Sequence, residues 1–160
     1  MTILGIDPGT TRIGYGLVEA EAGRFTFREA GILPFSGGDR FSTVRDVRTH
    51  LNRILTSFKP AAVSLERIYF AKNRKTGIQV AEMRGVIVSC IIECGVPLYE
   101  YSPNEVKSAL TGYGFADKKS VLKMVKLILR EPDLALLDDA SDALAIAIVA
   151  GMRKGGIGGG

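Results

Sequence analysis

The sequence contains too few cysteines for a fold built around them. Of its 160 residues only Cys90 and Cys94 are cysteines, and they lie four positions apart on one apolar helical stretch. Two cysteines alone cannot complete a zinc site. We therefore expect both to be buried, reduced thiols of a cytoplasmic protein, with a redox or metal role as the alternative.

Long apolar runs and a leader-like segment are also missing. No apolar run reaches the roughly 18 residues that a membrane-spanning helix requires, and Arg84 and Glu93 interrupt the best candidate. The first strand-like segment begins at Thr2, which leaves no room for a basic and then apolar secretory leader. These absences predict a cytoplasmic protein without a membrane partner.

No internal repeat and no interior linker divides the chain. Its length suits a single domain with a sizeable core, and its share of hydrophobic residues, 46%, is ordinary for a globular protein. We expect one domain over residues 1–153, followed by a glycine-rich tail, residues 154–160, that cannot pack and is disordered.

A modest excess of positive charge is what the composition does contain. Lysine and arginine number 21 against 17 aspartates and glutamates, and the isoelectric point is about 9.2. This balance hints at nucleic-acid binding, although many proteins with other functions are equally basic. The excess becomes more informative if several acidic residues form a metal site, because the remaining surface is then more cationic still.

Hydrophobic periodicity predicts strands first and then alternating helices and strands. Apolar or β-rich runs predict strands at Thr2–Asp7, Ile13–Ala20, Arg24–Leu33, Ala61–Glu66 and Val96–Tyr101. Helical spacing predicts helices at Asp39–Phe58, Thr76–Glu93, Pro103–Leu110, Asp117–Arg130 and from Asp138 or Asp139 to about Met152. This order is typical of an α/β domain with a mixed sheet.

Acidic residues stand out by their places in these predicted elements. Asp7 and Glu66 each end an apolar strand, and α/β proteins keep their sites at the carboxyl ends of neighbouring strands. Asp139 and Asp142, three positions apart, share one face of the last helix. Each has a simpler explanation when taken alone: Asp7 precedes Pro8-Gly9 and suits a turn, and acids near a helix N-terminus interact favourably with the helix dipole.

Four carboxylates gathered in one place predict a divalent cation. They would repel each other and lose hydration if partly buried, and Mg²⁺ or Mn²⁺, which prefers oxygen ligands, removes both penalties. Two such ions about 4 Å apart can generate an attacking hydroxide and stabilise the leaving oxygen at a phosphodiester. The neighbouring Asp138 suits a helix cap instead.

Three segments resemble the RuvC family of bacterial Holliday junction resolvases. They are Gly5-Ile6-Asp7-Pro8-Gly9-Thr10 with Gly14-Tyr15-Gly16, then Glu66 to Asn73, and finally Asp139 to Ala147. The similarity keeps its order and spacing over residues 1–152. It implies a ribonuclease-H-like α/β fold, in which a mixed five-stranded sheet with three antiparallel strands first is flanked by helices on both faces.

The resemblance also implies an activity, a cofactor and partners. Members of this family are Mg²⁺-dependent endodeoxyribonucleases that cut four-way (Holliday) DNA junctions at two symmetric positions in homologous recombination and DNA repair. They act as homodimers together with the RuvA and RuvB branch-migration proteins. The residues implied to be catalytic and to hold two Mg²⁺ ions, or Mn²⁺ as a substitute, are Asp7, Glu66, Asp139 and Asp142.

Aromatic and basic residues near these acids indicate a DNA-binding surface. Rings after Glu66 can stack on unpaired bases, and cations can contact phosphates; Lys107 and Lys118 also resemble basic positions of the family. The predicted DNA-binding residues are Tyr69, Phe70, Lys72, Arg74, Lys75, Lys107, Lys118 and Lys119. Phe70 could equally pack beneath its loop, and a lysine-rich helix face is often simply solvated. At positions 67 and 69 relatives often carry residues other than Arg67 and Tyr69.

The stretch Val86–Ile92 is apolar nearly all round a predicted helix. Such a helix needs cover on both faces. It could bury entirely in the protein's own core, but the family resemblance favours a two-fold dimer contact over part of it.

Three other functions fit parts of the sequence. The first motif also resembles the phosphate-binding motif of actin, Hsp70 and sugar kinases, but those proteins need two such domains closing over ATP, and the other acids would be unexplained. A junction-binding module that does not cut gains nothing from carboxylates facing phosphates. A nuclease that acts on RNA–DNA hybrids cannot be distinguished by composition, although the Tyr69–Lys75 segment and the predicted dimer favour branched DNA.

Overall fold

The computed structural model describes residues 1–9, 11–34, 39–67 and 74–155, with residues 74–76 and 155 described by their backbone alone. Within these residues the strands are β1 (Thr2–Pro8), β2 (Ile13–Glu21), β3 (Arg24–Ile32), β4 (Ala62–Glu66) and β5 (Leu98–Tyr101). The helices are α1 (Arg40–Phe58), α2 (Arg74–Glu93), α3 (Pro103–Thr111), α4 (Lys118–Leu129) and α5 (Asp138–Gly155).

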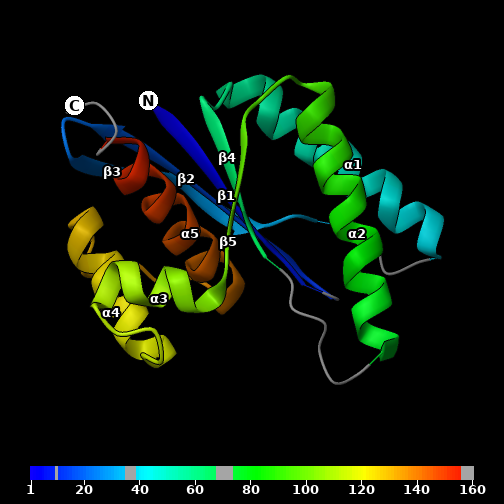
Figure 1. Ribbon diagram of the computed structural model, residues 1–160. Coiled ribbons are helices and arrows are strands. Elements are labelled where there is room, and N and C mark those ends of the chain that lie inside the picture. The colour runs from blue at the N-terminus through cyan, green and yellow to red at the C-terminus, as the bar shows by residue number, and fades with distance from the viewer. Residues whose placement is uncertain (10, 35–38, 68–73, 156–160) are drawn as a thin grey trace.

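The strands form one mixed sheet in the order β3-β2-β1-β4-β5. The pairs β1–β2 and β2–β3 are antiparallel, whereas β1–β4 and β4–β5 are parallel. Helices α1 and α2 cover one face of the sheet, and α3, α4 and α5 cover the other (Figure 1). The predicted five-stranded sheet, with its three antiparallel strands and its helices on both faces, is therefore confirmed.

Side-chain caps fix where several helices begin. The Asp39 carboxylate accepts hydrogen bonds from the backbone N–H groups of Phe41 and Ser42 at the start of α1. Ser102 and Glu105 form a reciprocal capping box at α3, with Pro103 in the first turn. These contacts satisfy N–H groups that have no partner inside the helix, so the local sequence determines where each helix starts.

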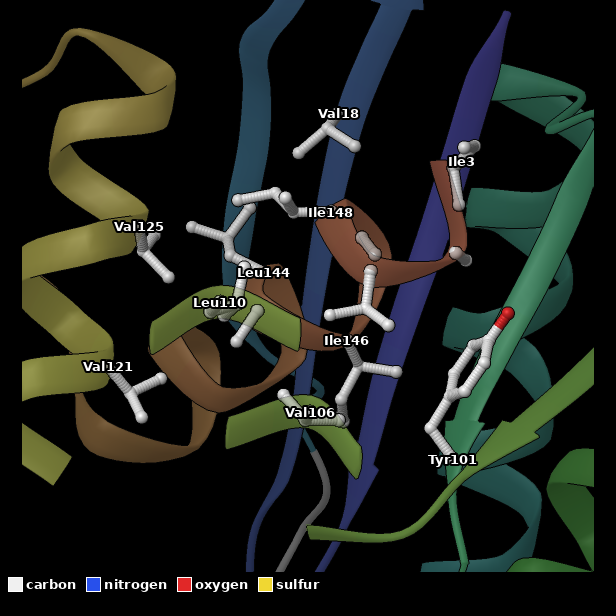
Figure 2. Close-up of a cluster of buried hydrophobic side chains, with 14 of the residues drawn as sticks. Ile3, Val18, Tyr101, Val106, Leu110, Val121, Val125, Leu144, Ile146 and Ile148 are labelled. Carbon is white, nitrogen blue, oxygen red and sulfur yellow. The ribbon is translucent and has the colours of Figure 1, made fainter. Parts of the chain in front are cut away.

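Two hydrophobic cores lie on opposite faces of the sheet. Alternate residues of a strand point to opposite faces, so Leu4 and Ile6 of β1 pack with α1 and α2. On the other face, side chains of α3 and α4 such as Val106 and Val125 pack against Leu144 of α5 (Figure 2). Strand β1 thus contributes side chains to the cores on both faces of the sheet. This explains why its residues are apolar in succession and do not alternate with polar ones.

The structure corrects one expectation about α2 and shows which of its sides the core covers. Cys90 is buried as predicted, but Cys94 is exposed, because it lies in the turn after α2 has ended. Within Val86–Ile92, the side chains of Ile87 and Ile91 are buried in the core against the sheet, whereas Ile92 is 68% exposed. The helix is therefore covered on one face by the protein itself.

Some predicted boundaries shift by a few residues. Strand β5 begins at Leu98 rather than at Val96, and α5 continues past Met152 to Gly155. Asp138 and Asp139 both lie in the first turn of α5. Residues 156–160 of the predicted tail lie outside the described part of the chain. Among the described helices, none combines the length and apolar character that crossing a membrane requires.

Candidate active site

Asp7 and Glu66 lie side by side at the ends of two neighbouring strands. In the parallel pairing of β1 with β4, Ile6 is the partner of Leu65, which puts the next residue of each strand at the same level. Asp7 points to the face of α5, because Gly5, two residues earlier, packs against that helix. Both carboxylates are half-buried. The predicted proximity of these two acids is confirmed.

Two glycines allow α5 to lie directly on the sheet. A Cβ atom at Gly5 would lie 1.9 Å from the Ala143 carbonyl oxygen, and one at Gly14 would lie 2.0 Å from the Asp139 carbonyl oxygen. Gly14 is also the strand partner of Asp7. The first turn of α5 is therefore held against the end of β1, which explains why the first motif needs a glycine at position 14.

The four acids and two lysines line one pocket of about 310 Å³. Its lining consists of Asp7, Glu66, Pro103, Val106, Lys107, Lys118, Val121, Asp139, Asp142, Ala145 and Ile146. An adjoining hollow of about 270 Å³ is shared by Lys118 and Asp142 and also includes Lys119 and Asp138. The structure thus brings together all four predicted acids, with Lys107 and Lys118 among them and Lys119 beside them.

Burial and neighbouring charge make the ionised form of Asp7 unfavourable. Loss of hydration is the largest cause, followed by a hydrogen bond to Glu66 and the charges of Glu66, Asp142 and Asp139, and together they raise the pKa of Asp7 to about 9. Burial also raises the pKa of Asp142, although Lys118 opposes that change. Without a cation, the cluster therefore retains a proton at neutral pH.

Two basic side chains partly neutralise the acids. Lys118 Nζ lies 3.2 Å from Asp142 Oδ2, and the charge of Asp142 raises the pKa of Lys118. Arg12 Nη1 lies 3.9 Å from Asp139 Oδ2. The sequence analysis did not single out Arg12, which lies between β1 and β2, one residue before β2 begins.

The donor set fits a hard divalent cation. Mg²⁺ and Mn²⁺ bind carboxylate oxygens, and the unfavourable charge on Asp7 is what such an ion would relieve. Among the described residues, no three His, Cys, Asp or Glu side chains converge as a ready-made metal-binding group. A cation held by these carboxylates would compete with the proton on Asp7 and with Lys118 at Asp142.

The remaining predicted DNA-binding residues follow Glu66. Tyr69, Phe70 and Lys72 lie outside the described residues, and Arg74 and Lys75 are described by backbone alone, at the start of α2. Arg67 is described: it lies 3.8 Å from Glu105 of α3 and donates to the Glu100 carbonyl oxygen. Arg67 therefore joins β4 to the β5–α3 connection.

Comparison with known proteins gives one consistent family. The family model "Crossover junction endodeoxyribonuclease RuvC" matches residues 3–150. Proteins of that description from Syntrophomonas wolfei and Petrotoga mobilis are 44% identical over 149 residues and 40% identical over 152 residues. The first match covers 92% of this chain and 87% of the relative, and the second covers 94% and 93%.

Solved structures agree in fold. A Thermus thermophilus RuvC structure matches with a TM-score of 0.88 and 32% identity, covering 98% of this chain and 97% of that one. A second, of T. thermophilus RuvC in complex with Holliday junction substrate, matches with a TM-score of 0.90 and 31% identity, covering 98% and 96%. The predicted ribonuclease-H-like fold is confirmed, and this chain belongs to the RuvC family of crossover junction endodeoxyribonucleases.

Proposed function

We propose that the protein resolves four-way (Holliday) DNA junctions in homologous recombination and DNA repair by hydrolysing two symmetric phosphodiester bonds. One observation carries the proposal: four carboxylates and two lysines line a single pocket in a chain of this family. The T. thermophilus relative in complex with a Holliday junction substrate supports a branched DNA as the substrate. The mixture of acids and lysines suits a phosphodiester, which needs cations around its own negative charge.

Asp7, Glu66, Asp139 and Asp142 are the proposed catalytic and metal-binding residues. Two bound Mg²⁺ ions, or Mn²⁺ in their place, would supply an activated water and neutralise the leaving oxygen. The carboxylates determine where such ions can sit, because Asp7 and Glu66 are fixed by adjacent strands and the other two by one helix turn. The sheet and α5 therefore set the geometry of hydrolysis.

Lys107 and Lys118 are the proposed phosphate contacts nearest to the site. Lys118 is paired with Asp142 in the structure, and if a cation were bound by that carboxylate, the ammonium group of Lys118 would be free to contact a DNA phosphate. Lys107 lines the same pocket from α3. The other proposed DNA contacts are Tyr69, Phe70, Lys72, Arg74, Lys75 and Lys119.

A homodimer formed through α2 is proposed on a stripe of residues that lies mostly outside the core, with Val88 at the edge of the core. Exposed or partly exposed apolar and small residues recur along α2 at alternating steps of three and four, at Ile78, Ala81, Gly85, Val88 and Ile92. This spacing is that of a helix–helix seam, and it lies on a different side of the helix from the buried Ile87 and Ile91. A two-fold axis at this seam would place two pockets on one junction.

The family also supports two further proposals. We propose that the protein works with the RuvA and RuvB branch-migration proteins, which co-sedimentation on a four-way junction can test. We also propose a cytoplasmic location, with which the free thiols of Cys90 and Cys94 are consistent.

The proposed function is tested by substrate choice. Labelled four-way DNA, duplex DNA and RNA–DNA hybrid are incubated with the protein, with and without Mg²⁺. We expect paired cuts in the four-way DNA alone, and only with the metal. Cutting of the hybrid in preference to the junction, or cutting in excess EDTA, would reject the proposal. Asp7→Asn protein prepared in the same way controls for contaminating nucleases.

A further inference from the structure

Two large aromatic side chains are exposed together between α3 and α4. Tyr113 is 61% exposed and Phe115 is 76% exposed. Their ring centroids lie 5.8 Å apart with the planes inclined by 58°, a favourable arrangement for two rings. Single exposed apolar residues are common on protein surfaces, but a pair of rings in contact offers a defined apolar face.

The segment that carries the pair lies against the start of α3, next to a residue that lines the acidic pocket. This segment turns back along α3, because a Cβ atom at Gly114 would lie 3.4 Å from the Asn104 carbonyl oxygen. Asn104 adjoins Pro103, which lines the pocket. Phe115 precedes Lys118 by three residues, so their Cα atoms are at most about 11 Å apart. DNA whose phosphate is held by Lys118 would therefore have this segment within reach of the nucleotides that flank that phosphate.

Local contacts hold this segment in one shape. The backbone N–H of Tyr113 donates to Thr111 Oγ1 at 3.1 Å, and the backbone N–H of Ala116 donates to the Tyr113 carbonyl oxygen at 3.1 Å. The Ala116 side chain is buried, and Gly112 ends α3 in the left-handed conformation with a φ of 78°. The rings are thus presented from an ordered turn, which lowers the entropy cost of using them in binding.

We propose that Tyr113 and Phe115 form a stacking platform for bases of the DNA strand that leaves the acidic pocket. Unpaired or partly unstacked bases offer flat faces to aromatic rings, and such bases occur at the crossover of a four-way junction. Charge complementarity favours DNA over a protein partner: Lys107 lies before the segment, and Lys118 and Lys119 follow it after Asp117, whose carboxylate caps α4 by accepting from the Ser120 backbone N–H. This inference rests on the proposed function, because it assigns a second contact to the same substrate.

The test measures junction binding and base stacking in one protein background. Asp7→Asn protein, which should bind without cutting, is compared with the same protein carrying Tyr113→Ala and Phe115→Ala. The probe is four-way DNA with 2-aminopurine beside the crossover. We expect the double substitution to raise Kd about tenfold or more and to remove the fluorescence quenching that stacking causes. The slope of log Kd against log salt should not change, because rings neutralise no phosphate.

Matched variants separate stacking from other effects. Tyr113→Phe keeps a ring and should bind as the parent does. Leu127→Ala removes an equally exposed apolar side chain from α4, 67% exposed, and should also have no effect. Melting temperatures should agree within error, since neither ring is in a core.

The remaining outcomes all count against the inference. Unchanged Kd and quenching in the double variant reject the platform while leaving the proposed function intact. A lower mass by light scattering in the double variant, with quenching retained, means that the rings contact a second copy of the chain instead. A parent protein that does not bind four-way DNA rejects the proposed function itself, and the platform with it.

Discussion

Asp7 carries the strongest electrostatic conflict among the acids of the pocket. In the unfolded chain its pKa is near 3.8, whereas burial and the neighbouring acids raise it to about 9 in the folded protein. Between these values the folded protein holds a proton that the unfolded chain has lost. The contribution of Asp7 to the stability of the metal-free protein is therefore most favourable at or below pH 4. This contribution becomes less favourable as the pH rises towards 9.

Asp7→Asn should separate stability from activity. The amide removes the charge with little change in shape, so metal-free protein at pH 8 should melt at least about 3 °C higher than the wild type, since each pKa unit is worth about 1.4 kcal/mol. Near pH 4 the difference should disappear. The same variant should lose cutting and keep junction binding. Calorimetry at the two pH values checks the first expectation; an equal pH dependence in both proteins would contradict it.

Lys107 and Lys118 should act on phosphates rather than on particular bases. Replacing either by alanine should weaken binding to junctions of any sequence by a similar factor and should flatten the salt dependence by about one counterion. Binding titrations over a range of salt concentrations measure both effects. Arg24→Ala, which removes an exposed cation at the outer edge strand β3, is the control and should change neither. A loss that depends strongly on junction sequence would indicate a base contact.

Contact between α5 and the sheet determines the positions of Asp139 and Asp142. Gly14→Ala would place a Cβ atom 2.0 Å from the Asp139 carbonyl oxygen, so the first turn of α5 must move by about 1 Å. A displacement of that size can cost about 100-fold in rate. We expect single-turnover cutting per folded molecule to fall by about that factor, together with a lower melting temperature.

Gly77→Ala is the matched control for this prediction. Gly77 lies in α2, and of the described residues none lies within 4 Å of an added Cβ atom. Alanine favours helix by about 1 kcal/mol over glycine, so this variant should melt slightly higher and cut normally. Normal cutting by folded Gly14→Ala protein would show that the contact of α5 with β2 does not set the site.

Most elements could be predicted from the sequence because their apolar spacing is local. The strands ending at Asp7 and Glu66 and the helix carrying Asp139 all occur where the periodicity indicated. Local spacing could not explain why position 14 is a glycine, because the explanation is its contact with α5, a helix more than a hundred residues later in the chain. Arg12 was missed for the same reason, since its partner Asp139 is distant in sequence.

The dimer proposed through α2 makes a prediction about the whole molecule. Ile92→Glu would place a carboxylate in an apolar seam, and an unpaired buried charge costs enough to raise the dimer Kd at least about a hundredfold. Light scattering at micromolar concentration should then give the monomer mass, and cuts in the two strands should become uncoupled. Leu127→Glu, at an exposed position of α4, is the control; a dimer unaffected by Ile92→Glu would exclude this seam.

The family resemblance led to the expectation of an interface on this helix, but the sequence did not indicate which side of the helix is available for one. Because the stretch Val86–Ile92 is apolar on nearly all sides of the helix, its sequence does not show which side packs against the core. The structure assigns Ile87 and Ile91 to the protein's own interior and leaves Ile78 and Ile92 exposed. Which face is free is a property of the assembled molecule, and no local pattern contains it.

Asp7 must face α5, against which its strand partner Gly14 packs. This requirement also limits where residues can be inserted in the chain. Successive residues of a strand alternate between faces, so one residue inserted in β1 before Asp7 would turn that carboxylate towards the core under α1 and α2. Insertions should be tolerated where they do not shift this alternation, for example at the turn between Glu21 and Arg24 or in the connection from α4 to α5. Variation in length among functional versions of this chain should therefore occur in such connections rather than in β1.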